Sequence, residues 1–151
     1  MSDYAGVYSI IDTLAAIAAA DTLLELTAAT DTGVDLIRAW VSPRGAVLDQ
    51  IQEINVFTND AAGTGTTQVP TLLKPGYAVF GGTARDVITV EGTTPTDKIE
   101  DGFHFQNGWL YLPVPEERIR IAGGDIMGIR FPVAPDAAMN IACGMIFGEL
   151  A

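Results

Sequence analysis

Residues able to perform chemistry are scarce in this chain of 151 residues. Nucleophilic catalysis needs a serine, threonine or cysteine beside an activating base. His104, the single histidine, alternates with Phe103 and Phe105, so we expect it on the polar face of a strand, solvated or hydrogen-bonded. Cys143, the single cysteine, lies in an apolar run, where cysteine behaves as a small buried hydrophobe. These counts exclude an intrachain disulfide and any single-chain zinc site that needs two cysteines or two histidines.

Carboxylates are the second possible source of chemistry. Asp97, Glu100 and Asp101 lie close together, and Glu116 and Glu117 form another group. A hydrolase of the glycosidase type would need two such groups facing each other across a cleft, one of them with a raised pKa. The first group could also hold calcium or magnesium, although the EF-hand pattern is absent. Because both groups lie in turn-rich sequence, we expect solvated charge, and we predict no enzyme, no catalytic residue and no cofactor.

Charge argues against a nucleic-acid partner. Eight Lys and Arg residues stand against nineteen Asp and Glu residues, which gives a net charge of −11 that repels phosphate backbones. The basic residues are scattered, without interleaved aromatic residues that could stack on bases. The glycine-rich residues 63–67 lack the Gly-Lys-Ser/Thr ending of a phosphate loop.

A membrane location is also not expected. The longest apolar stretch, residues 14–20, has seven residues, against the roughly 20 needed to span a bilayer. Residues 1–6 carry no basic side chain, so they do not form the start of a signal peptide. We therefore expect a protein made and kept in the cytosol, or released by lysis. Hydrophobic residues make up 48% of the chain, which suggests that a partner buries some apolar surface.

The elements that must position these residues are predicted to be short β-strands. Glycine and proline separate about nine β-rich runs, as expected of a β-sandwich or barrel. We expect one all-β domain over residues 1–151, a jelly-roll-like sandwich of about eight or nine short antiparallel strands with an N-terminal arm over about residues 1–6. The runs are residues 7–11, 22–27, 34–42, 49–58, 86–91, 103–112, 118–121, 126–131 and 140–147.

Three segments are less regular. Residues 12–26 contain an alanine run with high helix propensity, so a short helix competes with extended structure, which we favour. Residues 59–67 are predicted to be a flexible loop. Residues 72–82 form a second loop, unusually apolar for a free surface, and we expect Tyr77, Val79 and Phe80 in it to contact another chain.

The second half of the chain carries a recognisable pattern. Its most distinctive part is the string Asn107-Gly108-Trp109-Leu110-Tyr111-Leu112-Pro113-Val114-Pro115-Glu116-Glu117-Arg118. Shorter stretches fit the same scheme, among them 21–28, 81–84, 121–124, 128–135 and 144–150, whereas residues 44–49 and 64–80 match only loosely. Together they resemble the head-decoration, or capsid cement, proteins of tailed bacteriophages.

This resemblance implies a structural virion protein without chemistry. Such proteins are β-sandwich or jelly-roll subunits that trimerise on the outer capsid surface and clamp neighbouring major capsid protein subunits. By the resemblance we expect a homotrimer that is assembled in the host cytoplasm and binds the phage major capsid protein. The alternatives are a tail- or fibre-associated β-sandwich module that binds host-surface carbohydrate, and a hydrolase using Asp97, Asp101 or Glu116.

Individual roles are predicted as follows. Trp40 is expected in the core, and Trp109, Tyr111 and Leu112 are expected to anchor it, with an interface role as the alternative for Trp109 and Tyr111. The N-terminal arm is expected either to lie on a neighbouring subunit or to stay unordered. Glu116, Glu117 and Arg118 are expected to form ion pairs across subunits. The predicted interface residues are Tyr77, Phe80, Trp109, Tyr111, Glu116, Glu117 and Arg118.

Overall fold

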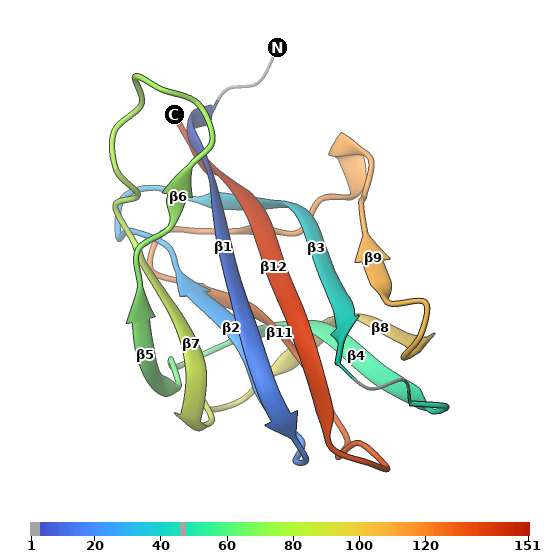
Figure 1. Ribbon diagram of the computed structural model, residues 1–151. Helices are drawn as coiled ribbons and strands as arrows, with labels where there is room; N and C mark the ends of the chain where they lie inside the picture. The colour runs from blue at the N-terminus through green and yellow to red at the C-terminus, as the bar shows by residue number, and fades with distance from the viewer. Residues whose placement is uncertain (1–3, 46–47) are drawn as a thin grey trace.

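Two antiparallel β-sheets pack face to face in the computed structural model, which describes residues 4–45 and 48–151 (Figure 1). In these residues the chain forms twelve strands and one short 3-10 turn, so the predicted all-β sandwich is confirmed, with more strands than the eight or nine expected. The strands are β1 (Tyr4–Ile17), β2 (Thr22–Thr27), β3 (Val34–Arg44), β4 (Ile51–Asn59), β5 (Thr64–Gln68), β6 (Thr71–Leu72), β7 (Thr83–Val90), β8 (Thr96–His104), β9 (Trp109–Tyr111), β10 (Arg120–Ile121), β11 (Ile126–Arg130) and β12 (Met139–Leu150), and the turn is η1 (Pro115–Glu117).

The strand order is that of a jelly roll. The first sheet runs β10-β3-β12-β1-β6, with β9 also paired to β3, and the second runs β5-β7-β2-β11-β4-β8. Nine of these strands form nested antiparallel pairs: β1 with β12, β2 with β11, β3 with β9 and β10, and β4 with β8. This nesting, divided between two sheets, defines the jelly-roll topology. The segment β5–β7 is an insertion that widens both sheets, because β6 pairs with β1 and β7 pairs with β2.

Residues 12–26 are extended, and the competing helix is wrong. They supply the end of β1 and most of β2, joined by a turn at residues 18–21. Tyr8 and Ile10 alternate into the core from β1, and Leu23, Leu24 and Leu26 are fully buried in β2. The alanine run has high helix propensity, but pairing with β12 as far as Ile17 satisfies its backbone in a strand, so tertiary context decides.

Other expectations need correction at element boundaries. The predicted loop at residues 59–67 includes most of β5, which pairs with β7. The single run predicted at 103–112 is the end of β8, a turn, and β9; Gly108 takes the positive φ of 70° in that turn. The arm predicted at 1–6 is strand from Tyr4 onward, and residues 1–3 lie outside the described part.

Trp40 was expected in the core but lies half-buried on the outer face of the first sheet. The Trp40 ring has room on this face because the outward-facing residues of the neighbouring strand β12 include Gly144 and Gly148. The Trp40 ring lies across Gly144, and the Tyr4 ring lies across Gly148, at places where any Cβ would collide with the ring. Two aromatic rings from neighbouring strands thus lie flat on β12 because glycine leaves room for them.

Substitution Gly144→Ala tests this arrangement. The new methyl group would overlap the Trp40 ring, and overpacking of this kind costs about 1–3 kcal/mol of unfolding free energy. Gly102→Ala is the matched control, because the nearest atom to its added Cβ is the Gln52 carbonyl oxygen at 3.8 Å. Urea denaturation followed by tryptophan fluorescence should show the loss for the first variant only. Equal stabilities would mean that Trp40 does not depend on the gap at Gly144.

Candidate functional site

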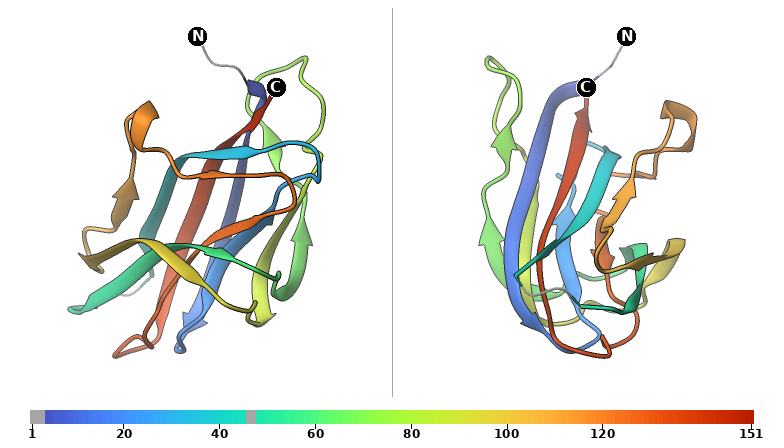
Figure 2. Two further views of the ribbon diagram at one scale, coloured as in Figure 1. Left: turned by 180° about the vertical axis from the view of Figure 1, so that it is seen from behind. Right: turned by 45° about the vertical axis from the view of Figure 1, so that its right-hand side comes forward.

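The predicted interface residues divide between two opposite edges of the sandwich. Residues 109–118 form β9 and the turn η1 at one side, which we call the β9 edge. Residues 73–82, which we call the β6 loop, project at the other side, and all views in Figures 1 and 2 separate the two (Figure 2). The structure therefore does not gather Tyr77 and Phe80 with Trp109 and Tyr111 into one site within a subunit.

At the β9 edge, Trp109 belongs to the core, as predicted. It is buried, its ring stacks on Tyr111 with centroids 6.2 Å apart, and its Nε1 donates a hydrogen bond to Asp101 Oδ2 at 3.1 Å. Tyr111 is half-buried and donates from its hydroxyl to the Glu117 carbonyl oxygen at 3.3 Å. Leu112 was expected to anchor the core, but it is 63% exposed because the chain turns outward after β9. Leu112 is thus available to a partner.

The charged end of this edge is partly used within the subunit. Arg118 Nη1 donates to the Tyr4 hydroxyl at 3.1 Å, and that hydroxyl donates to Asp35 Oδ2 at 2.9 Å. Arg120 adds a two-pronged ion pair with Asp35, at 2.6 and 2.8 Å. Burial opposes ionisation of Asp35, yet the hydrogen bonds from Arg120 and Tyr4 hold its pKa below the usual value.

The two predicted glutamates differ from Arg118. Glu116 and Glu117 are exposed on η1, and no ion pair is recorded for either side chain in the described residues. The single chain does not test ion pairs across subunits, which stay a prediction. The exposed positions leave both carboxylates free to meet a partner.

In the β6 loop, Phe80 and Tyr77 have different surroundings. Phe80 packs against Phe147 and Tyr8, with ring centroids 4.9 and 5.5 Å away, so it contributes to its own core. Tyr77 is exposed, and Val79 is 83% exposed. The exposed large apolar side chains of this loop are therefore Leu73, Tyr77 and Val79, and Phe80 fixes the loop to the sandwich.

His104 lies where its alternation predicts. Its Nε2 is 2.8 Å from Asp49 Oδ1, and its Nδ1 accepts a hydrogen bond from the Gln106 backbone N–H at 3.3 Å. Because Nδ1 is the acceptor in that contact, the Nε2–H group donates a hydrogen bond to the Asp49 carboxylate. Both ring nitrogens are then engaged in fixing the turn after β8.

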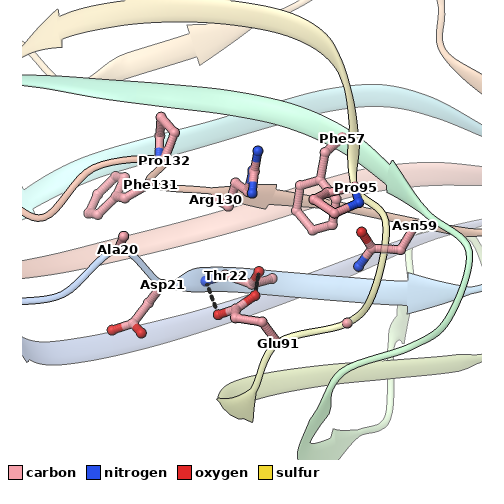
Figure 3. A pocket seen from close by; sticks show the side chains of 11 residues that line it. Ala20, Asp21, Thr22, Phe57, Asn59, Glu91, Pro95, Arg130, Phe131 and Pro132 are labelled. Atoms are coloured by element: carbon pink, nitrogen blue, oxygen red, sulfur yellow. Dashed lines mark hydrogen bonds between the residues drawn. The ribbon is translucent and has the colours of Figure 1, made fainter.

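A small hollow at one end of the second sheet is lined by polar groups, two of which, Glu91 and Arg130, are engaged by neighbouring side chains (Figure 3). Glu91 accepts hydrogen bonds from the backbone N–H and the hydroxyl of Thr22. Arg130 is paired with Asp97 at 2.9 Å, and its guanidinium lies over the Phe57 ring. The volume of about 80 Å³ suits a few water molecules, since a water occupies about 30 Å³ of the liquid. It is too small for a sugar or a nucleotide.

A larger, open hollow of about 640 Å³ lies on the outer face of the second sheet. Its walls are acidic, with Glu53, Asp97, Glu100 and Asp101. Asp97 is held by Arg130 and Asp101 accepts from Trp109, so two of the carboxylates predicted as hydrolase candidates fix the fold. In the described part of the chain no three acidic, histidine or cysteine side chains are grouped to hold a metal ion.

A carboxyl pair between the sheets was missed from the sequence. Asp12 points inward from β1 toward Asp86 of β7, which is 3% exposed and accepts a hydrogen bond from Gln68. One buried oxygen of each carboxyl has no hydrogen-bond donor. Burial and the neighbouring Asp86 raise the pKa of Asp12 to about 6. The sequence did contain a signal for this pair: Asp12 lies between Ile10 and Leu14 in an alternating strand, at a position where the alternation places side chains inward.

Cys143 should be inert toward thiol reagents in the folded protein. Burial, together with Asp12 and Asp86, raises the pKa of its thiol to about 12. A free cysteine with a pKa of about 8.5 is roughly a quarter ionised at pH 8, whereas Cys143 would be thiolate in about one molecule in 10,000. A chromogenic disulfide reagent should react with Cys143 only after unfolding in guanidinium. Rapid labelling of the native protein would contradict the buried position.

Asp12→Asn should change how stability depends on pH. Because folding raises the pKa of Asp12 from 3.8 to about 6, its contribution is fully present below about pH 4 and is lost as pH rises through about 6. The variant should remove this loss and gain about 1–2 kcal/mol over the wild type at pH 7.5, after allowance for solvent screening. Urea unfolding from pH 4 to 8 measures it, with Asp60→Asn as an exposed control. Parallel wild-type and variant curves would contradict the pairing.

The described residues contain no helix of the length and hydropathy that crossing a membrane requires. Comparison of the chain with protein-family models, with curated proteins and with solved structures finds no match.

Proposed function

We propose that the chain is a structural protein of a tailed-bacteriophage virion. It binds the outer surface of the capsid as a homotrimer and stabilises contacts between major capsid protein subunits, after assembly in the host cytoplasm. It acts by binding, without catalysis or a cofactor. The sequence resemblance centred on residues 107–118 supports this role, and the jelly-roll order is compatible with it because viral capsid and lectin domains use that fold.

The observation that carries the proposal is a pair of exposed apolar strips at opposite edges. The β9 edge exposes Leu112 and Val114, and the β6 loop exposes Tyr77 and Val79. A closed ring joins two different patches of each subunit, because its interfaces are head-to-tail. In a trimer, the β9 edge of one subunit would contact the β6 loop of the next, and aromatic residues such as Tyr77 often dominate such contacts.

Electrostatics favours an outer position on the shell. The net charge of −11 repels the packaged DNA, so an acidic subunit is compatible with the outside of a capsid. Neither apolar strip contains an acidic residue at its exposed tip: Leu112 and Val114 form one tip, and Tyr77 and Val79 form the other. Apolar contact can therefore form at these tips without burying a carboxylate.

A carbohydrate-binding tail or fibre module is the second candidate. A shallow hollow of about 240 Å³ lined by Trp40, Ser42 and Asn107 favours it, since sugars bind to aromatic rings flanked by polar groups. Against it, the Arg38 guanidinium lies over the Trp40 ring at 4.9 Å and covers the face on which a sugar would stack. Binding to a glycan array, abolished by Trp40→Ala, would support this candidate over the capsid role.

The ring arrangement predicts a defined pattern of masses in light scattering coupled to size exclusion. The wild type should be a trimer of three times 15.9 kDa, and Leu112→Asp and Val79→Asp should each be monomers. A mixture of the two variants should give a dimer, because one intact β9 edge meets one intact β6 loop and the ring cannot close. The control Ile51→Asp, exposed on β4, should stay a trimer. A monomeric wild type would refute the preassembled trimer.

Capsid binding is the direct test of the function. The purified protein should sediment with expanded capsid shells of the phage that encodes it, prepared without this protein, and should raise the temperature at which the shells break. Bovine serum albumin serves as the acidic control. Failure of the wild type to sediment with the shells would refute the proposed function.

A further inference from the structure

The outer face of the first sheet differs from the rest of the surface. Side chains point outward from the central strands β1, β12 and β3 and from β9, which pairs with β3. We call this surface the flat face. Its outward residues are Val7, Ser9, Ile11 and Thr13 of β1, Asn140, Ala142, Gly144 and Ile146 of β12, Arg38, Trp40, Ser42 and Arg44 of β3, and Leu110 of β9.

An apolar row crosses the flat face. The register places Ile11 beside Gly144, Gly144 beside Trp40, and Trp40 beside Leu110. Ile11 and Leu110 are more than half exposed, and the Trp40 ring fills the gap above Gly144 between them. Three large apolar side chains from β1, β3 and β9, with the β12 glycine beneath the Trp40 ring, form a surface suited to contact with another protein surface.

The charge on the flat face is opposite to that of the whole chain. Its cations are Arg38, which lies over Trp40, and Arg44, which donates to the Thr13 hydroxyl at 2.9 Å. The one acidic residue at its upper end, Asp35, is covered by Tyr4 and paired with Arg120. Among the described strand residues of this face no carboxylate is left unpaired, although the chain has nineteen acidic residues.

We propose that the flat face is the surface that docks on the capsid shell, against an apolar patch flanked by carboxylates that pair with Arg38 and Arg44. This inference rests on the proposed function and names the face that performs it. Tryptophan and arginine are the residue types that most often carry binding energy at the centre of interfaces. Elsewhere the acidic surface, for example the hollow containing Glu53 and Glu100, would repel a carboxylate-rich partner.

A second copy of the chain fits the flat face less well. Two-fold packing of one flat face on another would bring Arg38 and Arg44 of both copies together without an acidic partner, and like charges across an interface are unfavourable. Contact with the acidic hollow of another copy would join opposite faces of the sandwich, and stacking of this kind builds open fibres wherever the rotation between copies does not close a ring. The charges of the flat face therefore favour the capsid shell as its binding partner.

Two variants test the flat face by sedimentation with expanded shells of the encoding phage. Arg38→Glu reverses a charge, and Ile11→Asp places a carboxylate in the apolar row; both sites are exposed, so the fold should persist. Each should bind the shells at least tenfold more weakly while remaining trimeric. Lys98→Glu, an exposed charge reversal on β8 of the second sheet, should bind like the wild type. Wild-type binding should also weaken with added salt.

The outcomes separate this inference from the function on which it rests. If the wild type binds and Arg38→Glu and Ile11→Asp bind equally well, the flat face is not the docking surface and the capsid role stands. If either variant loses the trimer, the flat face joins subunits and the inference is wrong. If the wild type does not bind the shells, the proposed function fails first, and the inference fails with it.

Discussion

The fold depends on the insertion of β12 between β1 and β3. This one strand supplies backbone hydrogen-bond partners to both neighbours over most of its length. Without it, β1 and β3 would not belong to the same sheet. The same strand sets the two faces of the sheet. Inward, Met145 and Phe147 are fully buried in the core, and outward, Gly144 and Gly148 receive the rings of Trp40 and Tyr4. A core on one side and a low, apolar surface on the other follow from one alternating sequence.

The sequence was sufficient for the strands whose apolar residues alternate or cluster, such as β2, β3, β11 and β12. It was insufficient where pairing depends on a distant partner. The polar, threonine-rich β5 is a strand because β7 lies beside it, and nothing within residues 64–68 indicates that neighbour. Trp40 was misplaced because a bulge between Leu36 and Arg38 reverses the alternation of β3, and strict alternation from Leu36 would have placed Trp40 on the core side.

The candidate surfaces were likewise predictable from the sequence only in part. Burial of Trp109 and exposure of Tyr77 agree with what residue type and context indicate. The separation of the β9 edge from the β6 loop is a property of topology, since residues 73–82 and 109–118 reach opposite edges only after the insertion has crossed to β1. The carboxyl pair of Asp12 and Asp86 likewise forms only because β1 and β7 lie in sheets that face each other. The alternation in each strand indicates that both residues point inward, but it does not indicate that they meet.

The nested pairing also dictates when the chain can fold during its synthesis. The partner of β1 is made last, because β12 begins at residue 139 and β1 ends at residue 17. At about 5–20 residues per second, β1 is synthesised roughly 7–27 s before β12 is complete. Throughout that interval Tyr8 and Ile10 have no sheet to cover them, so the nascent chain offers an apolar strand to chaperones or to neighbouring nascent chains. The jelly roll can therefore be completed only after Leu150 has been synthesised.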